Sequence, residues 1–352
     1  MKKLLWVMAA LFVSFAAAAQ TRDSLDRIII NSAEEFLKIG STYSSSDSYI
    51  QTANIDLGDK GTMYTPIIST FSGTYDGGGY TISYKATFAG SSHEYYHTAG
   101  DYGLFGYVRG GTLKNMSVSG EVLMTAASGK PNDMNVALLC GHTNNYATID
   151  HCNVVGSVST YINAGNGGGA DAALMIGQAD NNTTVQYSTG SGNVVGVGWV
   201  GGLIGSCGSG TIKACTFSGQ VEAIQPDKNT PDQVTVGYGG FAGGIVGMAG
   251  ATGDNVSSAG STVTINLCYV NADITAGQVA SGIASVAVGA GTATVKNSCA
   301  EGSITKTEQN GETDTTTNST THTVQSNTYD SNDKTVDELE RIVEALNRGR
   351  AP

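Results

Sequence analysis

The segment His93–His97 carries the sharpest chemical signal in the chain, because it reads His-Glu-Tyr-Tyr-His. Two histidines spaced in this way on a helix can bind zinc, with the glutamate between them acting as a general base. A helix of this kind needs an apolar face, but glycine and serine flank the segment at 90–92 and at Gly100. The third histidine of the longer zinc-binding pattern would fall at Gly103. The sequence therefore favours an ordinary exposed loop over adventitious metal binding, and either of these over a catalytic zinc site.

The acidic residues do not form an obvious catalytic set. Cleavage of a polysaccharide needs paired carboxylates, or a calcium-binding carboxylate cluster beside a basic residue. From Gly110 to Glu340 there is no arginine, and Asp and Glu are scattered without a recurring acidic position. We therefore assign no catalytic, cofactor-binding or metal-binding residue. A polysaccharide-degrading enzyme is kept as the alternative to a non-catalytic protein.

Tyrosine is concentrated in the first third of the chain. Ten of the 16 tyrosines lie between Tyr43 and Tyr107. Amphipathic aromatic side chains suit sugar and protein surfaces. The sequence favours the other interpretation, in which these tyrosines pack the first coils and the cap. The candidate ligand-binding residues in this region are Tyr75, Tyr80, Tyr84, Tyr95 and Tyr96.

The elements that would position such residues are indicated by two patterns that recur together. The first is an apolar box that ends in glycine. Its copies are Gly103-Leu104-Phe105-Gly106, Leu138-Leu139-Cys140-Gly141, Leu174-Met175-Ile176-Gly177, Gly202-Leu203-Ile204-Gly205, Gly244-Ile245-Val246-Gly247 and the worn Gly282-Ile283-Ala284-Ser285. Recurrence of a short unit at intervals of a few tens of residues is the signature of a solenoid.

The second pattern, the threonine segment, follows each box. It begins at Thr112, Thr148, Thr184, Thr211, Thr264 and Thr294. The second position is always aliphatic and the third always polar, which is the period of a strand with one buried face. One extra residue at the fourth position marks the point where the strand could turn a corner. The sequence therefore predicts an inward ladder of Leu113, Ile149, Val185, Ile212, Ile265 and Val295, with Lys114, Asp150, Gln186, Lys213, Asn266 and Lys296 facing solvent.

The six cysteines are interpreted from the same register. Cys152, Cys215 and Cys268 share the inward fifth position of the threonine segment. Cys152 and Cys215 are two coils apart, about 9.6 Å, which exceeds the ~7 Å limit on the Cα separation in a disulfide. Cys215 and Cys268 are on adjacent coils and could form a bridge. Buried free thiols, packed as small hydrophobic groups, are the favoured state.

Together, the box and the threonine segment resemble the GLUG-motif repeat of secreted bacterial proteins. The preceding sequence is similar to that family as well, in Ile55-Asp56-Leu57, Thr65-Pro66-Ile67 and the run from Phe71 to Ile82. The resemblance spans roughly residues 28–302, and the serine at position 285 departs from the motif. It implies a β-helix in a cell-surface or adhesin-like setting, and no catalytic residues, because the motif is structural.

We therefore expect an all-β fold, a right-handed parallel β-helix with short capping helices at both ends. The expected organisation is a signal peptide at 1–19, the parallel β-helix with its N-terminal cap at 20–310, a polar Thr-rich loop at 311–334, and a C-terminal helix at 335–352. Ser32 is the expected first cap residue, since a glutamate follows it three positions later. Val336, Leu339 and Ile342 begin the apolar face of the C-terminal helix.

Export and charge limit the range of partners. Lys2 and Lys3, an apolar run from Leu4 to Phe15 and a small-residue site before Gln20 are typical of a signal peptide. The net charge of -12 makes nucleic acid and anionic membranes poor partners, and no other segment could span a membrane. We expect a non-catalytic exported protein, extracellular, at the cell surface or periplasmic. It would recognise a glycan or a host or surface protein in the manner of an adhesin, without a cofactor.

Overall fold

The computed structural model describes residues 20–90, 100–126, 134–161, 170–224, 240–250, 261–277, 279–285, 292–307, 313–317 and 328–330. The expected signal peptide, the His93–His97 segment with Tyr95 and Tyr96, and the expected C-terminal helix lie outside these residues.

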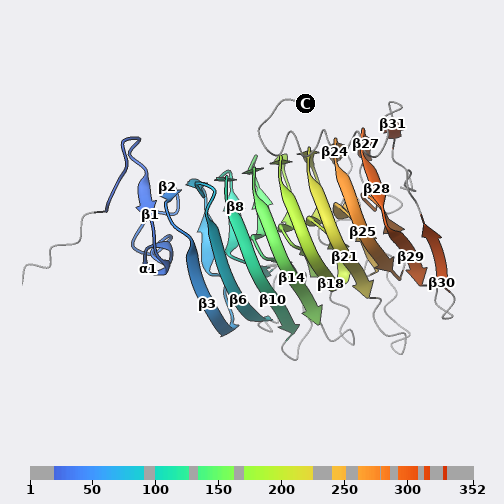
Figure 1. Ribbon diagram of the computed structural model, residues 1–352, viewed down its shortest axis with the longest axis horizontal. Coiled ribbons are helices and arrows are strands. Elements are labelled where there is room, and N and C mark those ends of the chain that lie inside the picture. Colours follow the sequence, from blue (N-terminus) through green and yellow to red (C-terminus); the bar gives the residue numbers. More distant parts are fainter. Residues whose placement is uncertain are drawn as a thin grey trace, which may run out of the picture.

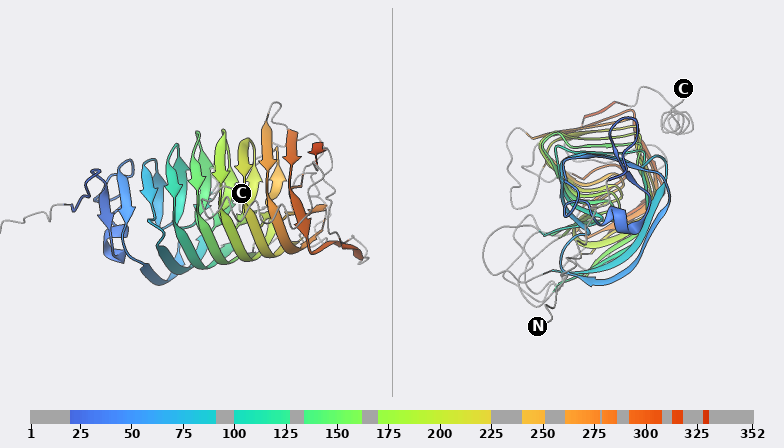
Figure 2. Two further views of the ribbon diagram at one scale, coloured as in Figure 1. Left: turned by 45° about the horizontal axis from the view of Figure 1, so that its top comes forward. Right: turned by 90° about the vertical axis from the view of Figure 1, so that its left-hand side faces the viewer.

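The described chain winds into a parallel β-helix whose coils stack along one axis (Figure 1). Each coil adds one strand to each wall, so a strand pairs with its counterpart in the next coil. Seen from the N-terminal end, the coils superimpose around a common interior (Figure 2). The predicted all-β solenoid is confirmed. Its stability is collective, because a single coil cannot bury its inner face alone.

Four rows of strands build the walls. The threonine sheet consists of β1 (Ile28–Ile30), β2 (Ser48–Gln51), β5 (Thr74–Asp76), β9 (Thr112–Lys114), β13 (Thr148–Asp150), β17 (Thr183–Gln186), β20 (Gly210–Lys213), β24 (Thr262–Asn266), β27 (Thr292–Lys296) and β31 (Thr328–Asp330). The long-strand sheet consists of β3 (Ile55–Met63), β6 (Thr81–Gly90), β10 (Ser117–Ala126), β14 (Asn153–Tyr161), β18 (Thr189–Gly201), β21 (Thr216–Ile224), β25 (Tyr269–Ala276), β28 (Cys299–Glu301), β29 (Ser303–Thr307) and β30 (Thr313–Thr317).

The other two rows flank the apolar boxes. The short-strand row contains β7 (Gly100–Tyr102), β11 (Met134–Ala137), β15 (Ala170–Ala173), the end of β18, β22 (Phe241–Gly243) and β26 (Val279–Ser281). The box sheet contains β4 (Ile68–Phe71), β8 (Phe105–Arg109), β12 (Cys140–Asn144), β16 (Ile176–Ala179), β19 (Ile204–Cys207) and β23 (Val246–Ala249). Because β18 runs on into the short-strand row, that row and the long-strand sheet form one continuous sheet.

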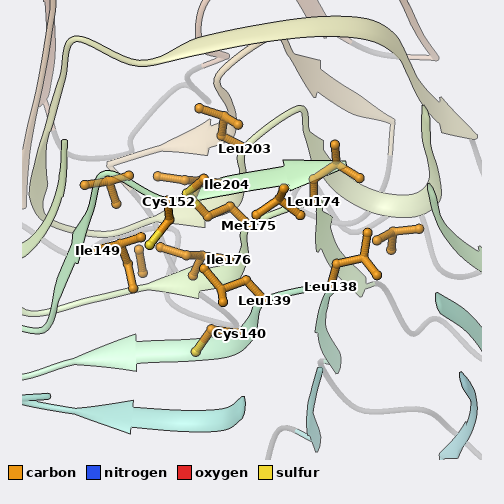
Figure 3. Close-up of a cluster of buried hydrophobic side chains, with 14 of the residues drawn as sticks. Leu138, Leu139, Cys140, Ile149, Cys152, Leu174, Met175, Ile176, Leu203 and Ile204 are labelled. Carbon is orange, nitrogen blue, oxygen red and sulfur yellow. The ribbon is translucent and has the colours of Figure 1, made fainter. Parts of the chain in front are cut away.

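The inward ladder of the threonine segments is confirmed. Its members pair in register from coil to coil and are at most 2% exposed. The third-position residues are exposed or partly exposed. The ladder also continues into earlier coils through Ile28, Tyr49 and Tyr75, which the sequence pattern did not reveal. Figure 3 shows Ile149 of this ladder and its corner neighbour Cys152 gathered with the side chains of three successive boxes in the core.

The corner predicted at the fourth position is present in every threonine segment. Six residues there have a left-handed backbone conformation, with φ between 46° and 57°: Asn115, His151, Tyr187, Ala214, Leu267 and Asn297. Only glycine and, to a lesser degree, asparagine adopt this conformation at little cost. The fifth-position side chain stabilises the turn from inside. Ser188 Oγ, for example, donates to the Gln186 carbonyl at 2.7 Å and accepts from the Cys152 amide at 3.1 Å.

The last glycine of the second to fifth boxes allows two backbones to approach closely. A Cβ at Gly141 would lie 2.5 Å from the Tyr102 nitrogen, and one at Gly177 would lie 2.5 Å from the Val136 nitrogen. Both contacts are with the short-strand row. The box is therefore a sharp fold between that row and the box sheet, with apolar side chains on the core side and no room for a side chain on the other.

Both ends of the described stack have additional elements. The helix α1 (Ala33–Phe36) begins at Ser32, whose Oγ accepts from the Glu35 amide at 3.3 Å, as predicted. It lies across the N-terminal end of the coils (Figure 2), and the Phe36 ring makes edge contacts with Tyr75 and Phe105. At the other end, β30 and β31 fall within the segment expected to be a polar loop, and β30 pairs antiparallel with β29.

All six cysteines are buried thiols that take part in no disulfide, the state favoured from the sequence. Burial raises the pKa of the Cys152 thiol to about 12. Its Sγ donates to the carbonyls of Leu113 and Asp150, each at 3.5 Å. A buried thiol that stays protonated is a packing group and a weak nucleophile.

Candidate functional site

Of the tyrosines predicted as a binding site, the structure buries Tyr75 and Tyr84 and leaves Tyr80 exposed. Tyr75 and Tyr84 are 0% and 2% exposed. Their hydroxyls are occupied inside the protein, where Tyr75 donates to Gln51 Oε1 at 3.1 Å and Tyr84 donates to the Leu138 carbonyl at 2.7 Å. These two side chains belong to the core, as the packing alternative expected, and cannot contact a ligand. Tyr80 is 38% exposed, at the turn between β5 and β6.

Tyr80 lies at the same edge of the solenoid as the left-handed corners, where the threonine sheet meets the long-strand sheet. Its carbonyl accepts from the Ser117 amide at 3.1 Å, and the Gly79 amide donates to the Asn115 carbonyl at 2.7 Å. The turn that carries Tyr80 is therefore hydrogen-bonded to the backbone around the Asn115 corner of the next coil. His151 and Tyr187 occupy the two corners that follow.

His151 and Tyr187 form a ring pair on this edge. Their ring centroids are 4.9 Å apart with an interplanar angle of 31°. His151 Nδ1 donates to Asp150 Oδ1 at 2.8 Å, and Lys213 Nζ lies 5.8 Å from the centroid of Tyr187. Both rings are partly exposed. We name the set Tyr80, Asn115, Asp150, His151, Tyr187 and Lys213 the corner cluster.

The corner cluster combines the faces of aromatic rings with hydrogen-bond donors and a hydrogen-bond acceptor. Its donors come from amide, imidazole and ammonium groups, and its acceptor from a carboxylate. Bulky residues in a left-handed conformation cost stability, and such outliers gather at functional sites. The equivalent corners of two other coils have Asn115 and Asn297, and asparagine adopts this conformation at a lower cost in stability than histidine or tyrosine. The arrangement is suited to binding, and it contains no nucleophile with a paired acid and base.

A second polar group, the junction cluster, lies where the short-strand row meets the box sheet. It comprises Asp101, Tyr107, Asn135, His142, Asp171, Gln178, Asp180 and Ser206. His142 Nε2 is 3.2 Å from Asp180 Oδ2, and its Nδ1 is 3.7 Å from Asp101 Oδ1. The Tyr107 ring stacks on His142 at 4.8 Å. Gln178 Nε2 donates to Asp180 Oδ2 at 2.8 Å.

The two aspartates keep His142 charged. Burial lowers the pKa of His142, but the interactions with Asp101 and Asp180 outweigh burial and raise this pKa to about 9. An imidazolium at neutral pH neutralises charge and does not act as a general base. Among the described residues, no group of three or more His, Cys, Asp or Glu is arranged to hold a metal ion.

Of the residues in the two clusters, sequence reasoning identified only Tyr80 as a candidate, although the register of the others was visible. His151 and Tyr187 are the fourth residues of their threonine segments, the position identified as the corner. Tyr107, His142, Gln178 and Ser206 each follow the last glycine of a box. The sequence shows that these positions are equivalent. It does not show which side chains of neighbouring rows meet across the box.

Fold and clusters together define a parallel β-helix protein with an aromatic, polar edge. No helix in the described ranges is long and apolar enough to cross a membrane. No protein-family model, curated protein or solved structure matches the chain. The resemblance to GLUG repeats accordingly rests on the motif residues alone.

Proposed function

We propose that this protein is a non-catalytic, adhesin-like binding protein, exported to the cell surface, the extracellular space or the periplasm. The corner cluster would bind a glycan, with a host or surface protein as the other class of partner. The observation that carries the proposal is the partly exposed His151–Tyr187 ring pair, held in a backbone conformation that disfavours both residues. The resemblance to GLUG repeats and the expected signal peptide support the setting.

A glycan fits the chemistry of the corner cluster. The ring faces can cover the apolar C–H face of a sugar, and Asn115, Lys213 and Asp150 can exchange hydrogen bonds with its hydroxyls. Equivalent positions repeat about every 4.8 Å along the edge, so an extended chain would meet several of them. The negative net charge disfavours nucleic acid as a partner.

Replacing His151 or Tyr187 with asparagine should separate binding from folding. Asparagine tolerates the left-handed conformation, so each variant should be as stable as the parent or more stable. Loss of a stacking ring should weaken glycan binding by about tenfold, equivalent to ~1.4 kcal/mol. The measurement is binding to a glycan array and to immobilised matrix proteins, with thermal unfolding in parallel.

Leu267→Asn is the matched control, because it makes the same change at a corner two coils beyond Tyr187. It should leave binding unchanged. If the His151 and Tyr187 variants bind as tightly as the parent, the corner cluster is not the binding site. Binding to matrix proteins but to no glycan would favour a protein partner.

A polysaccharide-degrading enzyme is the second candidate, and the junction cluster is the observation that favours it. Asp101 and Asp180 place two carboxylates on either side of His142. Paired carboxylates are what glycoside cleavage needs. An assay of polysaccharide cleavage beside the binding screen decides between the two. Cleavage that disappears in Asp180→Asn, without stable glycan binding by the parent, would replace the adhesin proposal.

A further inference from the structure

Cys215 and Cys268 are the two cysteines that neighbouring coils place side by side at the fifth position of the threonine segment. Immediately before them β20 pairs in register with β24, and immediately after them β21 pairs in register with β25. The register continues through the corner, where the Tyr269 amide donates to the Cys215 carbonyl at 3.0 Å. The two Cα atoms are therefore one coil apart, about 4.8 Å, which is within the roughly 4.4–6.8 Å found in disulfides.

The two thiol groups are also in contact. Both side chains are 0% exposed. Cys268 Sγ donates to the Ile212 carbonyl at 4.0 Å, and because Ile212 belongs to the coil of Cys215, this thiol leans toward that coil. Burial raises the pKa of the Cys215 thiol well above its usual value, and a hydrogen bond with the Cys268 thiol raises it further. Cys152, by contrast, is separated from Cys215 by the coil of Ser188.

This pair spans the longest step between successive threonine segments. Thr211 and Thr264 are 53 residues apart, whereas the other steps are between 27 and 36 residues. The entropic cost of closing a loop grows with its length. A disulfide stabilises a fold by restricting the unfolded chain, and its effect is larger for a longer loop. A bond at this position would therefore join two coils where the stack is costliest to close.

We propose that Cys215 and Cys268 form a disulfide that links the coil of β20 to the coil of β24 when the chain folds in the presence of a disulfide oxidant. The structure describes the dithiol form of the pair. The Cys215 thiolate attacks one sulfur of the oxidant and releases one thiolate. The Cys268 thiolate then attacks Cys215 Sγ and releases the second. The two protons lost by the cysteines pass to the two released thiolates, so the exchange balances.

The bond forms before the two coils are fully packed. Thiol–disulfide exchange needs an accessible thiolate, and burial opposes both access and ionisation. In a solenoid each coil contacts only its neighbours, so the stack can grow one coil at a time. Cys215 and Cys268 therefore meet when their own two coils pair, and stacking of β27 on β24 follows. The inference does not depend on the corner cluster or on the proposed function.

The test is refolding of the full chain in a mixture of reduced and oxidised glutathione, followed by alkylation of the remaining thiols and digestion with trypsin. Cys215 and Cys268 lie in different tryptic peptides, residues 214–228 and 229–296, and each is the only cysteine of its peptide. Mass spectrometry should find these two peptides linked in most of the folded protein and separate after reduction. The linked protein should melt about 5 °C above the reduced protein.

Serine variants provide matched controls, because Ser188 and Ser298 occupy the same position in other coils. Cys215→Ser and Cys268→Ser should each fold without the linked peptide, and reductant should leave their melting temperatures unchanged. Cys152→Ser should keep both the linked peptide and the effect of reductant.

The proposal is overturned if the folded parent contains no linked peptide, or if Cys215 or Cys268 is joined to a different cysteine. It is also overturned if reductant does not lower the melting temperature of the linked parent. The peptide analysis of the parent keeps the test decisive if a serine variant folds poorly.

Discussion

Replacing Ile212 with aspartate is expected to unfold the middle of the stack. Ile212 is 1% exposed and lies in the inward ladder between Val185 and Ile265. The substitution removes an apolar side chain from the core and places a carboxylate there without a partner. We expect a loss of about 4 kcal/mol or more in the free energy of unfolding. Because each coil is supported by its neighbours, the damage should spread beyond β20.

Denaturant unfolding followed by circular dichroism measures this effect. Gln186→Asp is the matched control, since Gln186 is at the outward third position on the adjacent strand. Its cost should remain within about 0.5 kcal/mol. If the Ile212 and Gln186 variants unfold at similar denaturant concentrations, the assignment of the inward face is wrong.

Replacing Gly156 with alanine should be the most damaging change of a single methyl group. Gly156 lies at the bend of β14 with φ at 149°, and an added Cβ would be 1.9 Å from the Gly120 carbonyl oxygen. The same clash recurs at Gly120, Gly192 and Gly219, which form one column with Gly156 along the long-strand sheet. Ala272 has the next position of this column, and Gly302 meets the Ala272 carbonyl oxygen in the same way. Relief requires the backbone of the adjacent coil to move. We expect a cost of about 3 kcal/mol or more.

Gly79→Ala separates the clash from the backbone conformation. Gly79 has φ at 81°, but nothing lies within 4 Å of its added Cβ. Its substitution should cost only about 1 kcal/mol. Thermal unfolding of both variants gives the comparison. A Gly156 variant no less stable than the Gly79 variant would show that the coils can separate cheaply at the bend.

The repeat pattern predicted the walls of the solenoid because residues at one register position meet the same surroundings in every coil. An inward position needs an apolar side chain whichever coil it belongs to. Ile149, Val185 and Ile212 were therefore recognisable as one ladder from the sequence. The corner was visible for the same reason, since one extra residue always separated the two alternating runs.

The early coils were harder to recognise. Tyr49 and Tyr75 stand at the ladder position, but large aromatic side chains replace the aliphatic residues there. These rings lie next to α1, and the centroid of the Phe36 ring is 5.7 Å from that of Tyr75. The requirement is imposed by the end of the stack and not by the repeat. The sequence favoured packing over a binding surface for the tyrosines of this region, and Tyr75 and Tyr84 are indeed core.

The sequence alone therefore determined the solenoid, its inward ladder, its corners and the Ser32 cap, because each depends on neighbours along the chain or on the repeat register. Only the tertiary structure decided which polar residues meet. Asp101, His142 and Asp180 belong to different coils, and the box glycines bring their two rows together. His151 and Tyr187 face one another because successive corners stack. These contacts depend on how neighbouring coils and rows are placed in three dimensions, and a local sequence pattern does not specify that placement.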